Sequence, residues 1–469
     1  MKNNKKLFIV FIIFIVSMSI FLLNFMKVDS DYFWHIKAGE YMFKNGVLTH
    51  DVFSWFVNGK YWMSHEWLFE IIIYVFKLLF SNSHLLVYGF VFISLLLLIL
   101  FFTNKENYLK NIPFSMFWLV LSLILLPFMQ GRPHLVSFSL LALTIYILFD
   151  NYNKKNSKVI YLLPFISLIW ANVHGGSSNL SYLLCLLFFI CGLFEFKFKK
   201  IESNRISKGQ LYKYLIVFVL SIITICINIH GIKMLFYPYL NMMDKTMLNN
   251  INEWAPTNLN IINHYIYLFV VVFIFFIMMI SDKKIRFIDI MLFGLSLFLG
   301  FKSIRFWAYT YIIMSYVVFN YVNKRKIDKG TNIILLLLSF TFIFMFICNI
   351  NSINKQINKR VLSLKVIEII KNEKPTRLFN MYDYGGELIY NDIDVFIDGR
   401  ADLYSKYNYK DYLNISNLNG DYIKLIKKYD FDYFLVNNKY SINTYLKYNS
   451  DYELIYKDKK VLLYKKIVN

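Results

Sequence analysis

Residues that interrupt helices are scarce in this sequence, which has only seven prolines and 17 glycines among 469 residues. Most of the chain is therefore expected to be helical. Cysteines are few as well, and all four lie inside apolar segments, at Cys185, Cys191, Cys226 and Cys348. This placement leaves no disulfide available to the polar segments, and the spacing contains no CxxC metal or redox motif.

Acidic residues are also in deficit, because 30 aspartates and glutamates face 51 lysines and arginines, giving a net charge of +21. In a soluble protein this excess would suggest nucleic-acid binding. However, 57% of the residues are hydrophobic, mean hydropathy is +0.46, and long apolar runs exclude a soluble globular protein. Because many basic residues lie in short loops between these runs, membrane topology explains the charge and no nucleic-acid partner is expected.

Apolar runs of membrane-spanning length recur along the first three quarters of the chain. We expect about eleven spans, at residues 7–26, 84–103, 113–129, 134–150, 158–172, 179–196, 213–229, 264–281, 287–301, 304–322 and 330–349. The first is expected to be retained, since no small-residue cleavage site follows it. The shorter segment Glu66–Phe80 carries a polar stripe of Glu66, Glu70 and Lys77, which predicts a helix lying in the membrane interface. The predicted fold class is an α-helical polytopic membrane protein with two interfacial juxtamembrane helices.

Loop charge supports this topology. With a cytoplasmic N-terminus in the cell membrane, the basic loops KENYLK, NYNKKNSK, KFKKIESNRISKGQ, DKKIR and NKRKIDK all fall inside. Counting Glu66–Phe80 as a span would put them outside. In the topology with a cytoplasmic N-terminus, all eight histidines lie on the outer side or at an outer helix end. The same holds for Arg132, Glu253, Trp254, Lys302, Arg305 and the NVHGG turn. Polar residues gathered on one face predict a catalytic cavity that opens outward.

Beyond about residue 350 the apolar runs shorten to strand length, in TRLFNMY, DVFIDG and DYFLVN, and YELIYKDKKVLLYKK is typical of a hairpin. Helical stretches such as Tyr422–Lys428 lie between them. We therefore expect a transmembrane domain at residues 1–350, with its first extracytoplasmic loop at 27–83. A small extracytoplasmic α/β domain is expected at residues 351–469.

Two aspartates, Asp29 and Asp31, stand where the first span ends, and carboxylates at a membrane exit indicate function. The stretch from Asp31 to Gly46, DYFWHIKAGEYMFKNG, resembles the acidic motif, helix and closing glycine of the GT-C superfamily of membrane glycosyltransferases. That superfamily includes the protein O-mannosyltransferases and the aminoarabinose transferases, which take a sugar from a polyprenyl-phosphate donor on the outer side of the membrane. The sequence departs from the pattern at Tyr32, the second acidic position, and in WMSHEW, which lacks the family's prolines.

The chain also resembles, over nearly its whole length, a group of uncharacterised bacterial GT-C-like membrane proteins. The shared elements are D-x-D-x-x-W-H, H-E-W-L, G-R-P-H, W-A-N-V-H-G, N-E-W, Y-G-G-E-L-I and F-I-D-G-R. The superfamily resemblance implies that Asp31, seconded by Asp29, is the general base of an inverting sugar transfer. The alternative is that Asp31 merely caps a helix that starts at Tyr32.

Cations at outer helix ends are the candidates for binding the donor phosphate, namely Arg305, Lys302 and Arg132. Each could instead be a snorkelling interface anchor. His35 follows Asp31 by one helical turn and can pair with it. The neighbouring His65 and Glu66 start the second interfacial helix and are expected to support the donor site, although hydrogen-bonding histidines without a catalytic role are the alternative.

On the acceptor side the candidates are His174, Glu253 and Trp254, with an interfacial aromatic anchor as the alternative for the tryptophan. In the tail, Asp383, Asp398, Arg400 and Asp402 lie near predicted strand ends. Ligands often bind there, but turn and capping chemistry is the favoured interpretation. Histidines and aspartates could bind a divalent metal, but no spacing of the H-x-x-E-H kind occurs. Neither a protein-encoded metal site nor another cofactor is therefore expected.

These features favour a membrane glycosyltransferase that moves a sugar from a polyprenyl-phosphate-linked donor to a cell-envelope glycan, lipid or protein on the outer face. A lipid-linked sugar transporter or flippase is one alternative, although its ionisable residues would lie near the midplane and no internal repeat is seen. A non-catalytic membrane scaffold with an exported tail is the other, and it predicts that Asp31 and Arg305 can be lost without effect.

Overall fold

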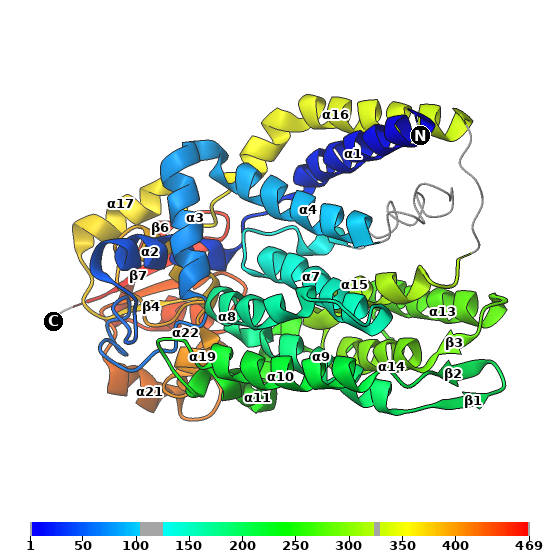
Figure 1. The fold of residues 1–469 in the computed structure, drawn as a ribbon. Coiled ribbons are helices and arrows are strands. Elements are labelled where there is room, and N and C mark those ends of the chain that lie inside the picture. Colours follow the sequence, from blue (N-terminus) through cyan, green and yellow to red (C-terminus); the bar gives the residue numbers. More distant parts are fainter. Residues whose placement is uncertain (1, 104–124, 323–328, 468–469) are drawn as a thin grey trace. The chain divides into compact units, whose positions relative to one another are not determined.

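The computed structural model describes residues 2–103, 125–322 and 329–467, and it divides into two compact units (Figure 1). The first unit is assembled from Met1–Lys27, Asn82–Met243 and Leu248–Ile357. The second is assembled from Val28–Ser81, Asp244–Met247 and Asn358–Asn469. Segments far apart in sequence thus contribute to each unit, and the first loop belongs with the tail.

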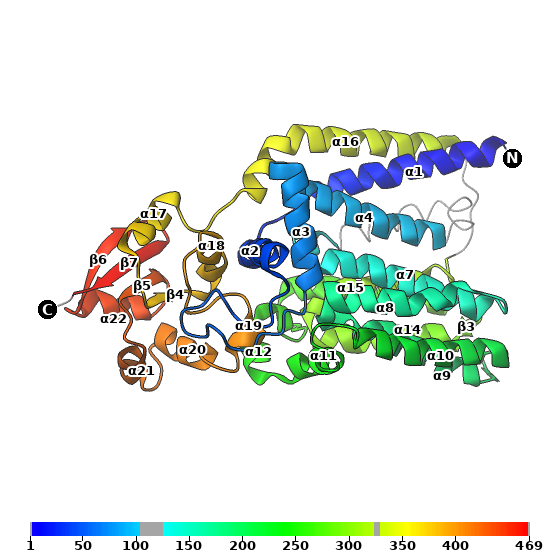
Figure 2. The ribbon, with the colours of Figure 1, turned by 60° about the vertical axis from the view of Figure 1, so that its left-hand side comes forward.

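The first unit is a bundle of apolar helices. Its helices are α1 (Lys2–Leu22), α4 (His84–Thr103), α7 (His134–Asn153), α8 (Leu163–Val173), α9 (Asn179–Leu193), α10 (Lys208–Ile225), α11 (Lys233–Met243), α13 (Tyr265–Ile280), α14 (Phe287–Lys302), α15 (Trp307–Val318) and α16 (Lys329–Ile357). The short α12 (Lys245–Asn250) is divided between the two units after Met247. The helix α1 lies along α16 (Figure 2). Every residue of α15 from Ala308 to Val318 is buried, so α15 is the core helix of the bundle.

The described residues include six segments long and apolar enough to cross a membrane, which makes this a membrane protein. They are Phe8–Phe25, Trp67–Phe102, His134–Asn153, Gly175–Leu193, Lys208–Ile225 and Asn332–Ile357, and Val159–Val173 and Tyr265–Ile280 are shorter apolar helices. The predicted span 113–129 lies for its greater part outside the described residues. The count of about eleven spans therefore stays a prediction.

Two basic loops that were predicted to share one side of the membrane pair with each other. The strands β1 (Phe196–Phe198), β2 (Ile201–Ser203) and β3 (Ile285–Arg286) form a small sheet in that order. In it β2 and β3 are parallel, with Ile201 opposite Ile285. A third basic loop joins them, because Lys213 at the start of α10 donates to the carbonyl of Ser157 at 2.7 Å. These three loops therefore lie at the same end of the helices, and their place on the cytoplasmic side stays a prediction.

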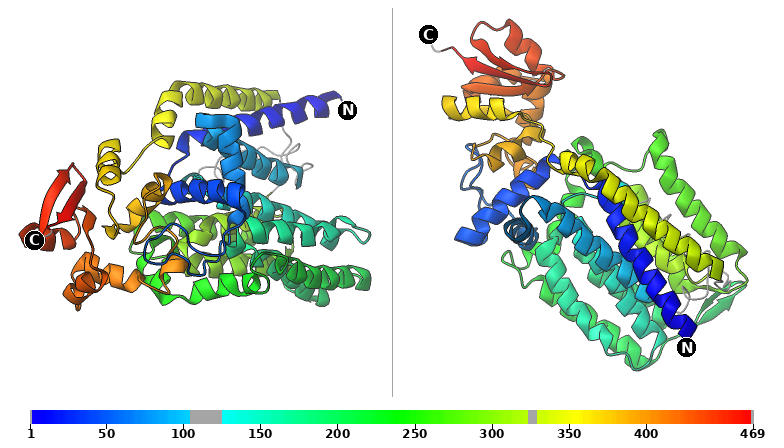
Figure 3. Two further views of the ribbon diagram at one scale, coloured as in Figure 1. Left: turned by 90° about the vertical axis from the view of Figure 1, so that its left-hand side faces the viewer. Right: turned by 90° about the horizontal axis from the view of Figure 1, so that it is seen from above.

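The second unit combines two helices of the first loop with the α/β tail. The loop helices are α2 (Ser30–Asn45) and α3 (Trp67–Phe80). The tail contains α17 (Leu364–Glu373), β4 (Leu378–Asn380), α18 (Gly385–Tyr390), α19 (Ala401–Tyr404), α20 (Tyr409–Asn417), α21 (Tyr422–Tyr429), β5 (Tyr433–Asn437), α22 (Ile442–Tyr448), β6 (Tyr452–Lys457) and β7 (Val461–Lys466). Its sheet has the order β4-β5-β7-β6, with β4 and β5 parallel and the predicted hairpin formed by β6 and β7 (Figure 3).

One predicted strand of the tail is wrong. The run DVFIDG is not a strand, and only Val395 forms an isolated bridge, to Ser54 of the first loop. The backbone N–H of Phe396 donates to the side chain of Asn380 instead of to a neighbouring strand. Val395, Phe396 and Ile397 are nevertheless fully buried, and a short apolar run buried on all sides has the same pattern as a core strand.

The helices α2 and α3 pack closely against each other. A β-carbon at Gly39 would collide with the backbone carbonyl of Glu70, so this glycine sets how near the two helices approach. The helix α3 ends at Ser81, which has a left-handed φ of 46°, and α4 begins after it as a separate helix. The predicted helical segment Glu66–Phe80 is therefore present, and its place in the membrane interface stays a prediction.

Candidate functional site

The helix α2 begins at Ser30, and its cap is Asp29 rather than Asp31. The Asp29 carboxylate accepts the backbone N–H of Tyr32 at 3.0 Å, which satisfies one donor of the first helical turn. The alternative interpretation of Asp31 as a helix cap is therefore wrong. Asp31 stands inside the first turn, where the helix dipole favours a negative charge, and its side chain is half-buried.

The tail contributes to the surroundings of Asp31. A β-carbon at Gly399 would overlap Oδ1 of Asp31 and would lie 3.0 Å from Nε1 of Trp34. The close approach of this loop therefore requires glycine. The Trp34 indole N–H is buried and has no hydrogen-bond partner within the described part of the chain. An unused buried donor beside a carboxylate is the kind of group that a substrate can satisfy.

A buried ionic network joins the first loop to the tail. Arg400, with a side chain 0% exposed, contacts Asp51 at 2.5 Å and Asp398 at 2.6 Å, and its guanidinium lies 4.7 Å from the ring centre of Trp62. Burial acts to lower the pKa of Arg400, but the charges of Asp398 and Asp51 outweigh it and hold the pKa well above its ordinary value. The Tyr404 hydroxyl donates to Asp398 at 2.5 Å, and the backbone N–H of Ser54 donates to Asp51 at 2.9 Å, so both carboxylates have a partner besides Arg400.

Sequence reasoning assigned Asp398 and Arg400 to turn and capping chemistry and overlooked Asp51. Asp398 does accept the backbone N–H of Arg400 at 2.9 Å, which is turn chemistry. Its larger role is to share the buried guanidinium with Asp51, 349 residues away from Arg400 in sequence. No local pattern signals a partner at that distance. Of the other tail candidates, Asp402 is buried, and burial raises the pKa of Asp383.

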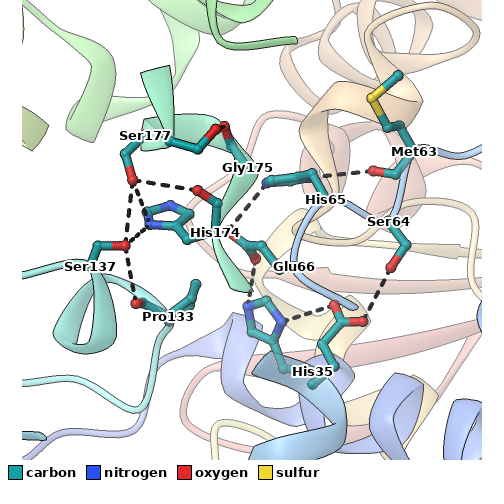
Figure 4. A network of polar contacts seen from close by, with 12 residues as sticks. His35, Met63, Ser64, His65, Glu66, Pro133, Ser137, His174, Gly175 and Ser177 are labelled. Atoms are coloured by element: carbon teal, nitrogen blue, oxygen red, sulfur yellow. Dashed lines mark hydrogen bonds and ion pairs between the residues drawn. The ribbon is translucent and has the colours of Figure 1, made fainter. Parts of the chain in front are cut away.

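A second buried cluster lies between α2 and α3. Nδ1 of His35 lies 3.2 Å from Glu70, and its Nε2 lies 3.6 Å from Glu66 (Figure 4). His65 contacts the other oxygen of Glu66 at 3.2 Å. In the described residues, His35, Glu66 and Glu70 form a group whose ligand atoms all lie within 4.8 Å of one another. The sequence predicted supporting roles for His35, His65 and Glu66 and placed Glu70 only on a polar stripe.

In the first unit, His174 is the centre of a polar cluster. Arg305 Nη2 lies 3.2 Å from Nε2 of His174, and since a guanidinium can only donate, that nitrogen accepts. The imidazole is therefore neutral with its proton on Nδ1, which lies 2.7 Å from the hydroxyl of Ser137 and 3.1 Å from that of Ser177 (Figure 4). Tyr309 donates to Ser177 at 3.2 Å. Hydroxyls thus fix the tautomer that positions Arg305.

Other predicted residues gather around Arg305 in this unit. Its guanidinium lies 4.9 Å from the ring centre of Trp254, and Arg132 lies 3.8 Å from Glu253. The candidates for the donor phosphate and for the acceptor side thus form one group. Lys302 ends α14 close by in sequence, and it is exposed.

Comparison with known proteins gives a fold but no family. No family and no curated protein matches the sequence. The apo crystal structure of the oligosaccharyltransferase of Archaeoglobus fulgidus is similar, with a TM-score of 0.52, 11% identity and coverage of 92% of this chain and 69% of that chain. The same enzyme tethered to an acceptor peptide containing the NVT sequon gives a TM-score of 0.49, 12% identity and coverage of 90% and 68%.

The likeness to the apo enzyme, at 11% identity, shows a shared fold. That fold is of the GT-C type, so this chain is a polytopic membrane protein with a GT-C-like fold.

Proposed function

We propose that the protein is a membrane glycosyltransferase that moves a sugar from a polyprenyl-phosphate-linked donor to a cell-envelope acceptor. The placement of Asp31 carries this proposal. Its carboxylate stands in the first turn of α2, two residues after the cap Asp29 and six after the first apolar segment ends at Phe25. The Gly399 loop and the Trp34 indole lie beside it. The GT-C-like fold supports the same function.

In the proposed reaction the acceptor hydroxyl or amine attacks the anomeric carbon of the donor sugar. Asp31 takes the proton of the nucleophile as the new glycosidic bond forms. The bond between the anomeric carbon and the phosphate oxygen breaks, and the polyprenyl phosphate leaves with the electron pair. Attack from the face opposite to the leaving group inverts the configuration of the sugar.

The departing phosphate needs cations, and Arg305 and Arg132 are the first candidates, with Lys302 as a third. Arg305 is the best of them because the neutral His174 and the Trp254 ring fix its guanidinium. Trp254 and His174 are proposed to face the acceptor side, where an aromatic ring can stack on a sugar. Glu253 holds Arg132 in this arrangement.

We further propose that the N-terminus is cytoplasmic and the tail extracytoplasmic. In a variant without native cysteines, single cysteines placed at Asn204 and at Asn419 test this topology, because both positions are exposed. A membrane-impermeant thiol reagent should label position 419 in intact cells and position 204 only after lysis. Labelling of both from outside would contradict the proposed topology.

The decisive test of the reaction compares Asp31→Asn with Asp29→Asn in purified protein supplied with a panel of polyprenyl-phosphate sugars. Asparagine caps helices as well as aspartate does, so Asp29→Asn should preserve α2. Asp31→Asn should lower kcat by about 100- to 10,000-fold, as expected for loss of a general base. Full transfer by Asp31→Asn would refute the assigned base. If the wild type binds polyprenyl-phosphate sugars but transfers none of them, a transporter or scaffold would be favoured.

A further inference from the structure

We propose that His35, Glu66 and Glu70 form a binding site for a divalent transition-metal ion, with Mn²⁺ or Zn²⁺ as the chemical class. This site rests on its own geometry and is independent of the proposed sugar transfer. It departs from the expectation that the chain encodes no metal site. That expectation depended on local spacing, whereas these ligands come from two helices, at positions 35, 66 and 70.

The first argument is charge. Glu66 and Glu70 have side chains 8% and 1% exposed, and one imidazole lies between them. Two neighbouring carboxylates removed from water repel each other unless positive charge is supplied. A divalent cation supplies two charges at one point, whereas an imidazolium at His35 would supply only one. The second histidine, His65, contacts Glu66 at the more exposed side of the cluster.

The second argument is ligand chemistry. Imidazole nitrogen with carboxylate oxygen is a set that suits Zn²⁺, Mn²⁺ and Fe²⁺, whereas Ca²⁺ and Mg²⁺ prefer oxygen alone. The three ligand atoms lie within 4.8 Å of one another. Ligands of a tetrahedral site are about 3.4 Å apart, so side-chain adjustments of about 1 Å would close the site.

The third argument is the rigidity of the support. Glu66 occupies the position just before α3, without a capping hydrogen bond from its side chain, and Glu70 follows one turn later. Both therefore lie on the face of α3 that meets α2. On α2, His35 and Gly39 are also one turn apart, and Gly39 brings the Glu70 backbone into close contact. The Phe69 ring packs against the His35 ring in a T-shaped contact, with ring centres 5.3 Å apart. Ligands on two tightly packed helices are held more precisely than ligands on loops.

The fourth argument is access. His65 is 15% exposed on its side chain, whereas His35 is 2% exposed. Ser64 donates to Glu70 at 3.4 Å and helps to orient that carboxylate. A cation held by His35, Glu66 and Glu70 would therefore be open on the side of His65. A water or a substrate oxygen could complete its coordination there, as in sites with an open position.

The test uses the full-length purified protein and Mn²⁺ alone, because the four native cysteines could hold Zn²⁺ but bind Mn²⁺ poorly. Chelator-treated protein is titrated with Mn²⁺, and bound metal is followed by electron paramagnetic resonance and by competition with Zn²⁺. The wild type is expected to bind about one equivalent and to melt at a higher temperature when loaded. No saturable Mn²⁺ binding by the wild type would overturn the proposal.

Variants locate the ion. Glu70→Gln and Glu66→Gln each remove a ligand charge with little change of shape, and each should weaken Mn²⁺ binding at least about 100-fold and abolish the rise in melting temperature. Glu40→Gln on α2, a partly exposed carboxylate paired with Lys37 and Lys44, is the matched control and should bind like the wild type. Equal binding by all three variants would also overturn the site. Because the readout is metal binding, loss of sugar transfer alone would leave this result unaffected.

Discussion

The two units bury polar groups in different ways. In the described part of the first unit, the cluster around His174 consists of a neutral imidazole, hydroxyls and one arginine that reaches an aromatic ring. The second unit buries whole ion pairs and carboxylate clusters, such as Arg400 with Asp51 and Asp398. Helices in a bilayer associate through packing and neutral hydrogen bonds, and the cluster around His174 follows this rule. The same unit also buries the carboxylate of Asp289, which is paired with Arg286.

In the second unit, buried charges pair with residues distant in sequence, and this pairing makes the packing of the tail on the first loop specific. A buried ion pair adds little net stability, but losing one partner leaves an uncompensated charge and is costly. The network of Asp51, Asp398 and Arg400 therefore fixes which tail loop meets which part of the first loop. The same tail loop carries Gly399, which contacts Asp31. The position of the proposed base Asp31 thus depends on the ionic network of Asp51, Asp398 and Arg400.

The largest effect is expected from Arg400→Met, which tests whether the second unit depends on its buried ions. It leaves two buried carboxylates without a counter-charge and should lower the free energy of opening of this unit by about 3–5 kcal/mol. Hydrogen exchange at the backbone amides of β5 measures this opening. The control Arg377→Met breaks an exposed pair with Asp430 and should cost about 0–1 kcal/mol. Equal losses of stability in Arg400→Met and Arg377→Met would contradict the view that the second unit depends on its buried ions more than on its exposed ion pairs.

The next effect tests the dependence of Asp31 on the tail. Gly399→Ala forces the Asp31 carboxylate to move, and a displacement of about 1 Å should lower kcat of transfer up to about 100-fold. The expected loss of stability is only about 1–3 kcal/mol. Gly209→Ala in α10 is the control, because a β-carbon there meets open space. If Gly399→Ala keeps the kcat of the wild type, the tail loop does not affect the reaction at Asp31.

A smaller effect is expected in the first unit, where hydrogen bonds orient one cation. Arg305→Lys keeps the charge but loses the fork that meets His174 and stacks near Trp254. The value of kcat/KM for the donor should fall about tenfold, or about 1.4 kcal/mol, because lysine keeps the charge but loses a hydrogen bond to the departing phosphate. Lys208→Gln at the exposed start of α10 is the control for lost surface charge. An unchanged kcat/KM in Arg305→Lys would contradict the assignment of Arg305 to the donor phosphate.

The smallest effect concerns pH. Burial raises the pKa of Glu387 above its ordinary value of 4.5, although its carboxylate accepts the N–H groups of Val361 and Leu362 at 2.6 and 3.0 Å. The folded state therefore holds this proton more tightly than the unfolded state does. This contribution to stability is present below the ordinary value and is lost as pH rises through the raised pKa. Melting curves from pH 4 upward should show a weaker pH dependence in Glu387→Gln, and an unchanged slope would contradict the raised pKa.

The sequence predicted the features that are local. Apolar length predicted the long helices, and alternating short runs predicted the β6–β7 hairpin and the strand β5. Loop charge predicted that the basic loops carrying β2 and β3 share one side of the membrane, but it did not predict that these strands pair. The helix at Glu66–Phe80 was also predicted within a residue, as α3.

Contacts between distant segments were beyond this kind of inference. In the sequence Asp51 is an ordinary loop residue, and only the structure shows its contact with Arg400. Likewise Glu70 is only part of a polar stripe in the sequence, whereas the structure shows its contact with His35. The cap was misjudged because Asp29 and Asp31 both precede a plausible first turn. DVFIDG was misjudged as a strand because burial on all sides, which it shares with core strands, does not require a ladder partner.

The pairing of Asp51 with Arg400 also has a consequence for how the protein is made. The two residues are 349 positions apart, so at about 5–20 residues per second the aspartate leaves the ribosome roughly 20–70 s before its arginine exists. During that interval the first loop has no counter-ion for a carboxylate that ends up fully enclosed. Chains released early, or held by a stalled ribosome, would therefore carry an unfinished loop that quality-control proteases can recognise.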